Sequence, residues 1–333
     1  MSGHEPQIKI SIPAAASRLL GALRRAGFEA YVVGGCVRDS LLGRTPGDWD
    51  ICTSARPEQV RTVFSAYRQI LTGEKHGTVA VIVGGTPYEI TTYRVDGQYH
   101  DSRHPDAVQF VPQVQPDLAR RDFTINAMAY APGEGLIDLY GGRSDLHACL
   151  MRCVGDPEER FAEDALRILR AVRLAAQLDF ALEKATERAA LDMRQSIQNI
   201  SAERIYTELD KLLAAPAAGK VLSRYGRILA GAVPEIEPCI GCTQPGRWHC
   251  YDVWQHNAVA FCGGVFFCMI WPSRNAAPSA RTARRISPAT TRPEVKWRAA
   301  SCCGSRRLLI LWKAPARWLL STMVPCPAMM PAS

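Results

Sequence analysis

The chain has 333 residues, of which 47% are hydrophobic, and it carries 40 Lys and Arg residues against 32 Asp and Glu residues. This length suits two or three domains with sizeable cores, and the lack of any run of about 18 apolar residues argues against a membrane span. Residues 1–11 show no signal-peptide pattern, so we expect a cytoplasmic protein whose 12 cysteines are reduced thiols.

The net charge of +8 is concentrated at the C-terminal end. Residues 261–333 hold 11 Lys or Arg residues and a single acid, Glu294. Removing these from the totals of 40 and 32 leaves 29 basic and 31 acidic residues in residues 1–260. A nucleic-acid site must therefore be argued from where arginines cluster in the first 260 residues, and not from the total charge.

The first half of the chain alternates between helical and strand patterns. Apolar periodicity and turn residues predict helices over 13–27, 37–42, 57–64 and 118–130, and strands over 30–33, 49–53, 79–83 and 88–93. The last two strands form a hairpin across residues 84–87, and the polar segment 94–107 is expected to be a mobile loop. The pattern predicts a mixed sheet with flanking helices.

A glycine pair and an acidic pair lie close together near the start of this region. Gly34 and Gly35 would let backbone amides approach an anion, and Arg38 lies one helical turn further on. If residues 48–53 form a strand, Asp48 and Asp50 share one of its faces, where two neighbouring carboxylates favour a divalent cation. Each feature alone is commoner as a plain turn or a solvated strand end, but together they predict a site for a metal and a nucleotide.

Glu89 lies on the second strand of the predicted hairpin. It is either a third carboxylate beside Asp48 and Asp50 or a solvent-facing side chain, and the sequence leaves both interpretations open.

After residue 144 helical periodicity replaces the strand pattern, with helices predicted over 161–178, 186–195 and 201–213. Asp164, Arg167, Arg170 and Arg173 recur at a spacing of three on the strongest helix. Such a row is often only a solvated face. Its three arginines nevertheless repel one another unless an anion or acid lies opposite. Asp164 and Arg167 together offer an acceptor and a donor fork that suit the Watson–Crick edge of a base.

Three motifs resemble those of the class II nucleotidyltransferases, the family of bacterial CCA-adding enzymes and poly(A) polymerases. The resemblance extends over residues 31–211. The motifs are Gly34-Gly35-Cys36-Val37-Arg38-Asp39 with Asp48-Trp49-Asp50, then Arg120-Arg121-Asp122-Phe123-Thr124-Ile125-Asn126-Ala127, and Glu163-Asp164-Ala165-Leu166-Arg167-Ile168-Leu169-Arg170.

The resemblance implies a role for each of these positions. Asp48 and Asp50 would hold two Mg²⁺ ions for in-line displacement at the α-phosphorus, with Glu89 as a candidate third catalytic acid. The nucleotide would be bound by Gly35, Arg38, Arg121, Asp122, Asp164, Arg167, Arg170 and Arg173. Within this set Asp122 would contact the ribose, Asp164 and Arg167 the base of CTP or ATP, and Arg170 and Arg173 phosphate and nearby backbone.

The resemblance implies an α+β head, residues 1–144, followed by an all-helical neck, residues 145–213, and the start of a truncated helical body, residues 214–260. The pattern around residues 77–106 favours addition or repair of the 3′-terminal CCA of tRNA from CTP and ATP. Poly(A) addition is the first alternative, and a catalytically silent RNA-binding fragment is the second.

Two features depart from the family pattern. Residues 251–256 resemble the opening of an HD-type metal domain, but no histidine follows His256, so we expect no phosphohydrolase activity. The pairs Cys239/Cys242 and His249/His256 could form a zinc site, yet the histidine spacing is unusual and idle thiols are the preferred interpretation.

Residues 261–333 contain clustered Arg, Pro and Cys, with four of the seven tryptophans. This composition favours an aberrant basic tail, disordered or translated out of frame. A native RNA-binding tail is the alternative.

Overall fold

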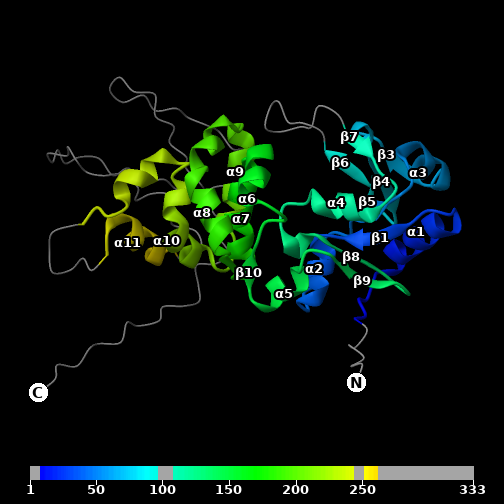
Figure 1. Ribbon diagram of the computed structural model, residues 1–333, viewed down its shortest axis with the longest axis horizontal. Helices are drawn as coiled ribbons and strands as arrows, with labels where there is room; N and C mark the ends of the chain where they lie inside the picture. The colour runs from blue at the N-terminus through cyan, green and yellow to red at the C-terminus, as the bar shows by residue number, and fades with distance from the viewer. Residues whose placement is uncertain (1–7, 97–107, 244–250, 262–333) are drawn as a thin grey trace, which may run out of the picture.

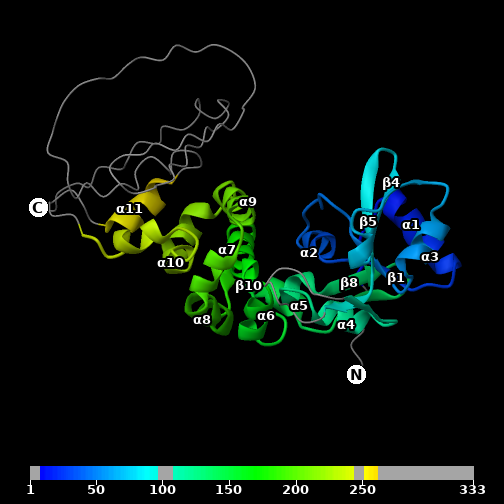
Figure 2. The ribbon, with the colours of Figure 1, turned by 90° about the horizontal axis from the view of Figure 1, so that it is seen from above.

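The computed structural model describes residues 8–96, 108–243 and 251–261. These residues form a head built on a mixed sheet and a helical part, which lie end to end along the long axis of the molecule (Figure 1 and Figure 2). The predicted fold class, a mixed sheet with flanking helices followed by helices, is confirmed.

The sheet of the head has seven strands in the order β3-β4-β5-β2-β1-β8-β9. Adjacent strands are antiparallel except for β2 and β5, which run parallel to each other. The strands are β1 (Ala30–Val33), β2 (Ile51–Thr53), β3 (Arg68–Ile70), β4 (Thr78–Val83), β5 (Thr86–Thr92), β8 (Met128–Ala131) and β9 (Gly135–Asp138).

Helices cover both faces of this sheet. Ile51 and Ile90 face a large core that also receives Leu19 and Leu23 of α1, whereas Cys52 faces a smaller cluster containing Leu118 of α4. The helices of the head are α1 (Ala14–Arg25), α2 (Gly35–Leu41), α3 (Pro57–Val63), α4 (Val114–Ala119) and α5 (Gly142–His147), with short η1 (Glu74–His76) and η2 (Thr124–Asn126). Strands β6 (Arg94–Asp96) and β7 (Val108–Phe110) form a separate antiparallel pair.

The remainder is helical, apart from two-residue strands β10 (Leu150–Met151) and β11 (Ala181–Leu182), which pair in parallel. Buried apolar side chains of α7 and α10 continue the large core into this part. The elements are α6 (Pro157–Glu163), α7 (Leu166–Leu178), α8 (Lys184–Asp192), η3 (Arg194–Asn199), α9 (Ala202–Leu213), α10 (Ala218–Leu229), η4 (Pro234–Cys239) and α11 (Val253–Ala260). No helix among the described residues has both the length and the apolar character that a membrane crossing requires.

The predicted helix over 118–130 is wrong. Helix α4 ends at Ala119, and the Arg-Arg-Asp motif follows this helix rather than starting one. The carboxylate of Asp122 accepts the Phe123 amide at 2.9 Å, which competes with continued helix formation. The apolar run that follows fills β8 between β1 and β9, because packing in the sheet outweighs helical propensity there.

The predicted helix over 161–178 consists of two helices. Asp164 interrupts it with an extended backbone, φ −145° and ψ 103°, and its Oδ1 accepts the Leu166 amide at 3.0 Å. Asp164 thus ends the first helix, and its side chain bonds to the backbone at the start of the second.

The strand expected over 49–53 begins at Ile51, although the Asp50 carbonyl still accepts the Val33 amide at 3.0 Å. The hairpin of β4 and β5 is confirmed, and its turn is the two glycines Gly84 and Gly85, both with positive φ. The expected loop over 94–107 begins as β6, and residues 97–107 lie outside the described residues, as do residues 262–333.

Candidate nucleotide and metal site

Parallel pairing of β2 with β5 aligns two acidic side chains. Ile51 lies opposite Ile90 in the register, so Asp50, which immediately precedes β2, comes next to Glu89 of β5. Both point away from the large core that Ile51 and Ile90 enter, because successive side chains alternate between faces. Asp48 precedes Asp50 by two residues, and Asp48, Asp50 and Glu89 are all exposed.

Electrostatic repulsion concentrates on Asp50. Crowding by protein atoms, together with the charges of Glu89 and Asp48, raises the pKa of Asp50 to about 6, although Arg121 opposes this. The residue is exposed overall, so water still reaches the carboxylate. A carboxylate such as Asp50, whose ionisation is disfavoured by neighbouring negative charge, is suited to a cation, which would relieve the repulsion.

The glycine turn after β1 brings an arginine over the acids. Gly34 has φ 81° and ψ −129°, a backbone conformation that glycine adopts at little cost. A Cβ atom at this position would lie 3.0 Å from Arg121 Nη1. The glycine therefore makes room for Arg121, whose Nε is buried and has no hydrogen-bond partner among the residues that the structure describes.

Arg38 is held by two neighbours rather than projecting freely. Its Nε and Nη2 donate to the carboxylate of Asp39 at 2.8 Å and 3.0 Å, and its Nη1 donates to Asn126 Oδ1 at 2.7 Å. The guanidinium lies close to Gly35, where an added Cβ would be 3.7 Å from Nη2. These contacts fix Arg38 beside the glycine turn.

Asp122 connects the head with the neck. Its Oδ2 accepts from Arg170 Nε at 3.0 Å and Nη2 at 2.8 Å, and its Oδ1 accepts from Asn126 Nδ2 at 3.2 Å. Burial by itself would raise the pKa of Asp122, but Arg170, the Asn126 hydrogen bond and Arg167 hold it below its ordinary value. The carboxylate is therefore ionised at neutral pH and forms a firm anchor.

Asp164 and Arg167 do not pair with each other. Asp164 Oδ2 accepts from Arg204 Nη2 at 2.9 Å, whereas Arg167 Nη1 donates to Glu163 Oε2 at 2.6 Å. Arg167 Nη2 also donates to the backbone carbonyl of Arg120 at 3.3 Å, which brings it against the Arg-Arg-Asp segment. Of the two predicted base-reading residues, Arg167 therefore contacts the head, whereas Asp164 is paired within the helical part.

Arg173 has acidic and amide partners within the helical part. Its Nε donates to Glu208 Oε2 at 2.5 Å and its Nη1 to Gln177 Oε1 at 2.7 Å. Glu208 belongs to α9 and is buried. In this structure Arg173 therefore joins α7 to α9.

Two residues that sequence reasoning did not single out contact the predicted site residues. Asn126 bridges Arg38 and Asp122, and Asp117 of α4 pairs with both Arg120 and Arg121. Asn126 lies inside the quoted motif, whereas Asp117 gave no signal beyond its position three residues before Arg120. An acid in a short apolar helix reveals its partners only in three dimensions.

The acid set can be tested against a divalent ion by its chemistry. Mg²⁺ is usually held by one or two carboxylates, waters and substrate phosphates rather than by a complete protein cage. Asp48 and Asp50 are the candidate carboxylates, and Glu89 lies next to Asp50. Within residues 8–96, 108–243 and 251–261, no three Asp, Glu, His or Cys side chains converge into a ready metal cage.

The possible metal motifs near the C-terminal end have other contacts. Asp252 caps α11, with its Oδ1 accepting the Gln255 amide at 2.6 Å and its Oδ2 the Gly241 amide at 2.7 Å. Cys239 is a buried free thiol and Cys242 a half-buried one, while His249 lies outside the described residues.

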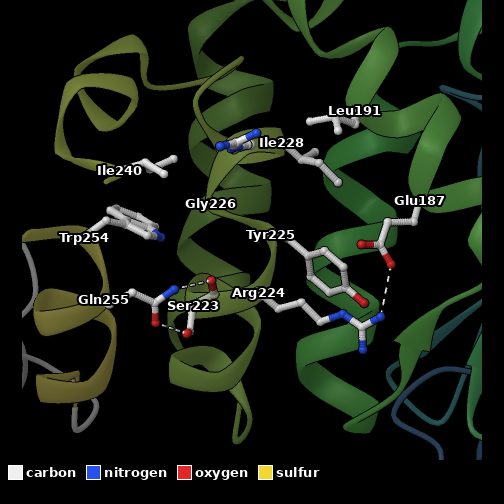
Figure 3. A pocket seen from close by; sticks show the side chains of 11 residues that line it. Glu187, Leu191, Ser223, Arg224, Tyr225, Gly226, Ile228, Ile240, Trp254 and Gln255 are labelled. Atoms are coloured by element: carbon white, nitrogen blue, oxygen red, sulfur yellow. Dashed lines mark hydrogen bonds and ion pairs between the residues drawn. The ribbon is translucent and has the colours of Figure 1, made fainter. Parts of the chain in front are cut away.

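A pocket of about 300 Å³ lies among α8, α10 and α11. Figure 3 shows Tyr225 and Trp254 on its lining, with Arg224 reaching Glu187 at 3.1 Å. The predicted nucleotide residues are not part of this lining, so the pocket is separate from the site at β2 and β5.

Comparison with known proteins supports the resemblance over the described head and neck. Residues 30–152 match the family described as "Poly A polymerase head domain". Residues 179–237 match "Probable RNA and SrmB- binding site of polymerase A". The two matches cover more than half of the chain.

Curated relatives are CCA-adding enzymes of bacteria. The Leuconostoc mesenteroides enzyme is 47% identical over 207 residues, which cover 62% of this chain and 51% of the relative. The Lactobacillus helveticus enzyme is 51% identical over 198 residues, covering 60% and 49%. The chain therefore spans about half the length of the curated relatives it matches.

Solved structures show the same relationship. The Bacillus stearothermophilus CCA-adding enzyme in complex with CTP matches with a TM-score of 0.58 and 43% identity, covering 65% of this chain and 51% of that one. The Thermotoga maritima CCA-adding enzyme complexed with tRNA matches with a TM-score of 0.56 and 26% identity, covering 67% and 53%. Together with the two family matches, these similarities show that the chain belongs to the nucleotidyltransferase family of CCA-adding enzymes and bacterial poly(A) polymerases.

Proposed function

We propose that this protein adds or repairs the 3′-terminal CCA of tRNA, without a nucleic-acid template, from CTP and ATP. The observation that carries the proposal is the alignment of Asp50 with Glu89 beside Arg121, in a chain whose relatives are CCA-adding enzymes. The reaction would take place in the cytoplasm. The division into head, neck and body start at residues 144, 213 and 260 is part of the same proposal.

Asp48 and Asp50 would hold Mg²⁺, with Glu89 next to them. A bound divalent ion would lower the pKa of the attacking RNA hydroxyl and neutralise charge on the triphosphate. The chain's own residues would do the positioning. Arg121 lies across the glycine turn with its Nη1 beside Gly34, so it is placed to contact phosphate at the turn.

On the base side, Asp164 and Arg167 would pair with the edge of CTP or ATP in place of a template. Their present partners, Arg204 and Glu163, satisfy the same acceptor and donor groups. Base binding would therefore exchange one set of charge-assisted hydrogen bonds for another. Asp122 would contact the ribose while Arg170 fixes its orientation.

The test is incorporation of labelled CTP and ATP into tRNA that lacks its 3′ end, in the presence of Mg²⁺. Two cytidines followed by one adenosine support the proposal. Long adenosine tracts would instead assign poly(A) synthesis, the activity after which the matched head family is named. Absence of incorporation by a folded protein that binds CTP would assign a silent RNA-binding fragment.

Replacement of the acids identifies where the chemistry takes place. We expect Asp50→Asn and Asp48→Asn each to reduce the rate by about 1,000-fold, since metal contacts contribute several kcal/mol to transition-state stabilisation. Asp138→Asn is the matched control, because this acid caps α5 through the amides of Gly142 and Arg143. Activity that survives the loss of both Asp48 and Asp50 would refute the metal assignment.

A further inference from the structure

Asp117 of α4 is a completely buried carboxylate beneath two consecutive arginines. Its side chain is 0% exposed. Its Oδ1 accepts from Arg120 Nε at 3.0 Å and Nη2 at 2.8 Å, and its Oδ2 lies 3.3 Å from Arg121 Nη2. Each oxygen of one acid therefore faces a different guanidinium.

Oδ1 of Asp117 also accepts the backbone amide of Arg94 at 3.3 Å. Arg94 is the first residue of β6 and follows closely after β5, which carries Glu89. The buried acid thus ties the end of the strand that carries Glu89 to the helix that precedes the arginine pair.

Arg121 extends from Asp117 to the predicted reaction centre. Its Nη1 lies against Gly34, at 3.0 Å from where a Cβ would be, and its charge acts on Asp50. Its Nε is buried and has no partner within the described residues. The guanidinium is therefore held through Nη2 by Asp117, whereas its Nε–H is not used within the described residues.

Arg120 contacts the helical part through its backbone. Its carbonyl accepts from Arg167 Nη2 at 3.3 Å, while its side chain is bound to Asp117. The neighbouring Ala119 carbonyl accepts from Arg160 Nη1 at 3.5 Å. Asp117 therefore also holds the backbone segment at Arg120 that Arg167 contacts.

We infer that Asp117 is a positioning residue for nucleotidyl transfer, which holds Arg121 for the triphosphate and the Arg120 carbonyl for Arg167. The inference rests on the proposed function. The contact with Asp117 Oδ2 holds the Arg121 guanidinium beside Gly34, where it would meet an incoming polyphosphate. Asp117 would thereby fix the position of the proposed triphosphate-binding residue Arg121 relative to the proposed base-reading residue Arg167.

The first experiment compares binding of CTP and of cytidine to Asp117→Asn, an isosteric change that removes the charge. We expect affinity for CTP to fall about tenfold, the usual loss for one charge-assisted hydrogen bond. Affinity for cytidine should change less than about twofold, because the nucleoside lacks phosphate. Equal losses for both ligands, or no loss for CTP, would overturn the inference.

Asp145→Asn is the matched control for loss of a buried acid. Asp145 is 6% exposed, accepts from Thr124 Oγ1 at 2.6 Å and pairs with Arg152 at 3.1 Å. It should lower the thermal midpoint without separating CTP from cytidine. A CTP-specific loss in this control as well would show that general loosening of the head explains the effect, and would overturn the inference.

A double-mutant cycle tests whether Asp117 acts through Arg121. In an Arg121→Met background, adding Asp117→Asn should weaken CTP binding less than about twofold further, because the positioned group is already absent. An undiminished tenfold loss would contradict the inference. Should Asp117→Asn not fold, Asp117→Glu serves the same comparison, since it keeps the charge and displaces it by one methylene.

Nitrogen-15 NMR of the arginine Nε–H groups gives a readout that needs no nucleotide. The buried Arg121 Nε–H should shift and exchange faster with solvent in Asp117→Asn, and should remain unchanged in Asp145→Asn. An unaltered Arg121 resonance in Asp117→Asn would overturn the inference. Wild-type protein that binds no CTP would overturn the proposed function instead, and the NMR result would still decide the role of Asp117.

Discussion

Asp122 and Arg170 form an ion pair between the head and the neck, with Arg170 Nη2 2.8 Å from Asp122 Oδ2. Asp122 follows α4 in the head, and Arg170 lies in the middle of α7. Asn126 continues the contact to Arg38 beside the glycine turn. A chain of charged and amide groups thus joins the predicted phosphate side of the site to the neck.

Arg170→Gln should lower the free energy of unfolding by about 2 kcal/mol. Asp122 is only 10% exposed and would lose its main partner, but Arg170 is 39% exposed, so solvent moderates the loss. Urea unfolding measures the change. Arg188→Gln is the control, because Arg188 is 86% exposed and its pairing with Asp192 at 3.6 Å should contribute almost nothing. Equal losses of unfolding free energy in the two variants would show that the Arg170–Asp122 contact stabilises the protein no more than an exposed ion pair does.

Glu89→Gln should lower the pKa of Asp50, because it removes a negative charge that acts on this carboxylate. The pKa of Asp50 is raised to about 6, so the folded protein binds an extra proton between the ordinary value of 3.8 and about 6. The contribution of Asp50 to stability is therefore present below pH 3.8 and is lost as the pH rises through about 6.

Carbon-13 NMR of the Asp50 carboxyl group measures this pKa in the free protein. Arg121→Gln should move it in the opposite direction, because it removes a positive charge. Added Mg²⁺ should lower it, since the ion competes with the proton. An Asp50 titration that does not respond to Glu89→Gln would place the two acids too far apart to share an ion.

Gly34→Ala should destabilise the head and disturb Arg121. The residue has φ 81°, and its new methyl group would lie 3.0 Å from Arg121 Nη1. Gly85→Ala is matched in backbone strain, with φ 84° and nothing within 4 Å of its Cβ. Both changes should cost about 1 to 3 kcal/mol in strain, measured by thermal unfolding. Only Gly34→Ala should also weaken CTP binding.

Glu208→Gln and Arg173→Met should each lower stability, and the double replacement should cost less than their sum. Arg173 Nε lies 2.5 Å from Glu208 Oε2, and both side chains are at most 12% exposed. We expect a coupling energy of about 1 to 3 kcal/mol from a double-mutant cycle in urea. A coupling near zero, with Arg173→Met affecting only nucleotide or tRNA binding, would restore the sequence-based interpretation of Arg173 as a phosphate ligand.

Much of the head followed from local pattern. The hairpin of β4 and β5 has turn glycines between apolar strands, and α1 has an apolar stripe that ends at a glycine-containing turn. These elements combine strong periodicity with residues that favour a specific turn, so neighbouring residues suffice to predict them.

The segment after α4 shows where local pattern is insufficient. Residues 120–131 have the composition of a helix, yet they form a turn, η2 and β8. β1 and β9 lie on either side of β8 and take up its backbone hydrogen bonds. Pairing with strands that are distant in sequence cannot be predicted from the segment itself.

The sequence by itself determined which chemical groups are present and in what order: an acidic pair after a glycine turn, an Arg-Arg-Asp segment and a row of arginines on one helix. Only the tertiary structure decided their partners. It set Glu89 beside Asp50 through strand register, turned Asp164 towards Arg204 and Arg173 towards Glu208, and buried Asp117 beneath Arg120 and Arg121. The physical reason is that charged side chains interact over a few ångströms of space, and the fold alone determines which of them come that close.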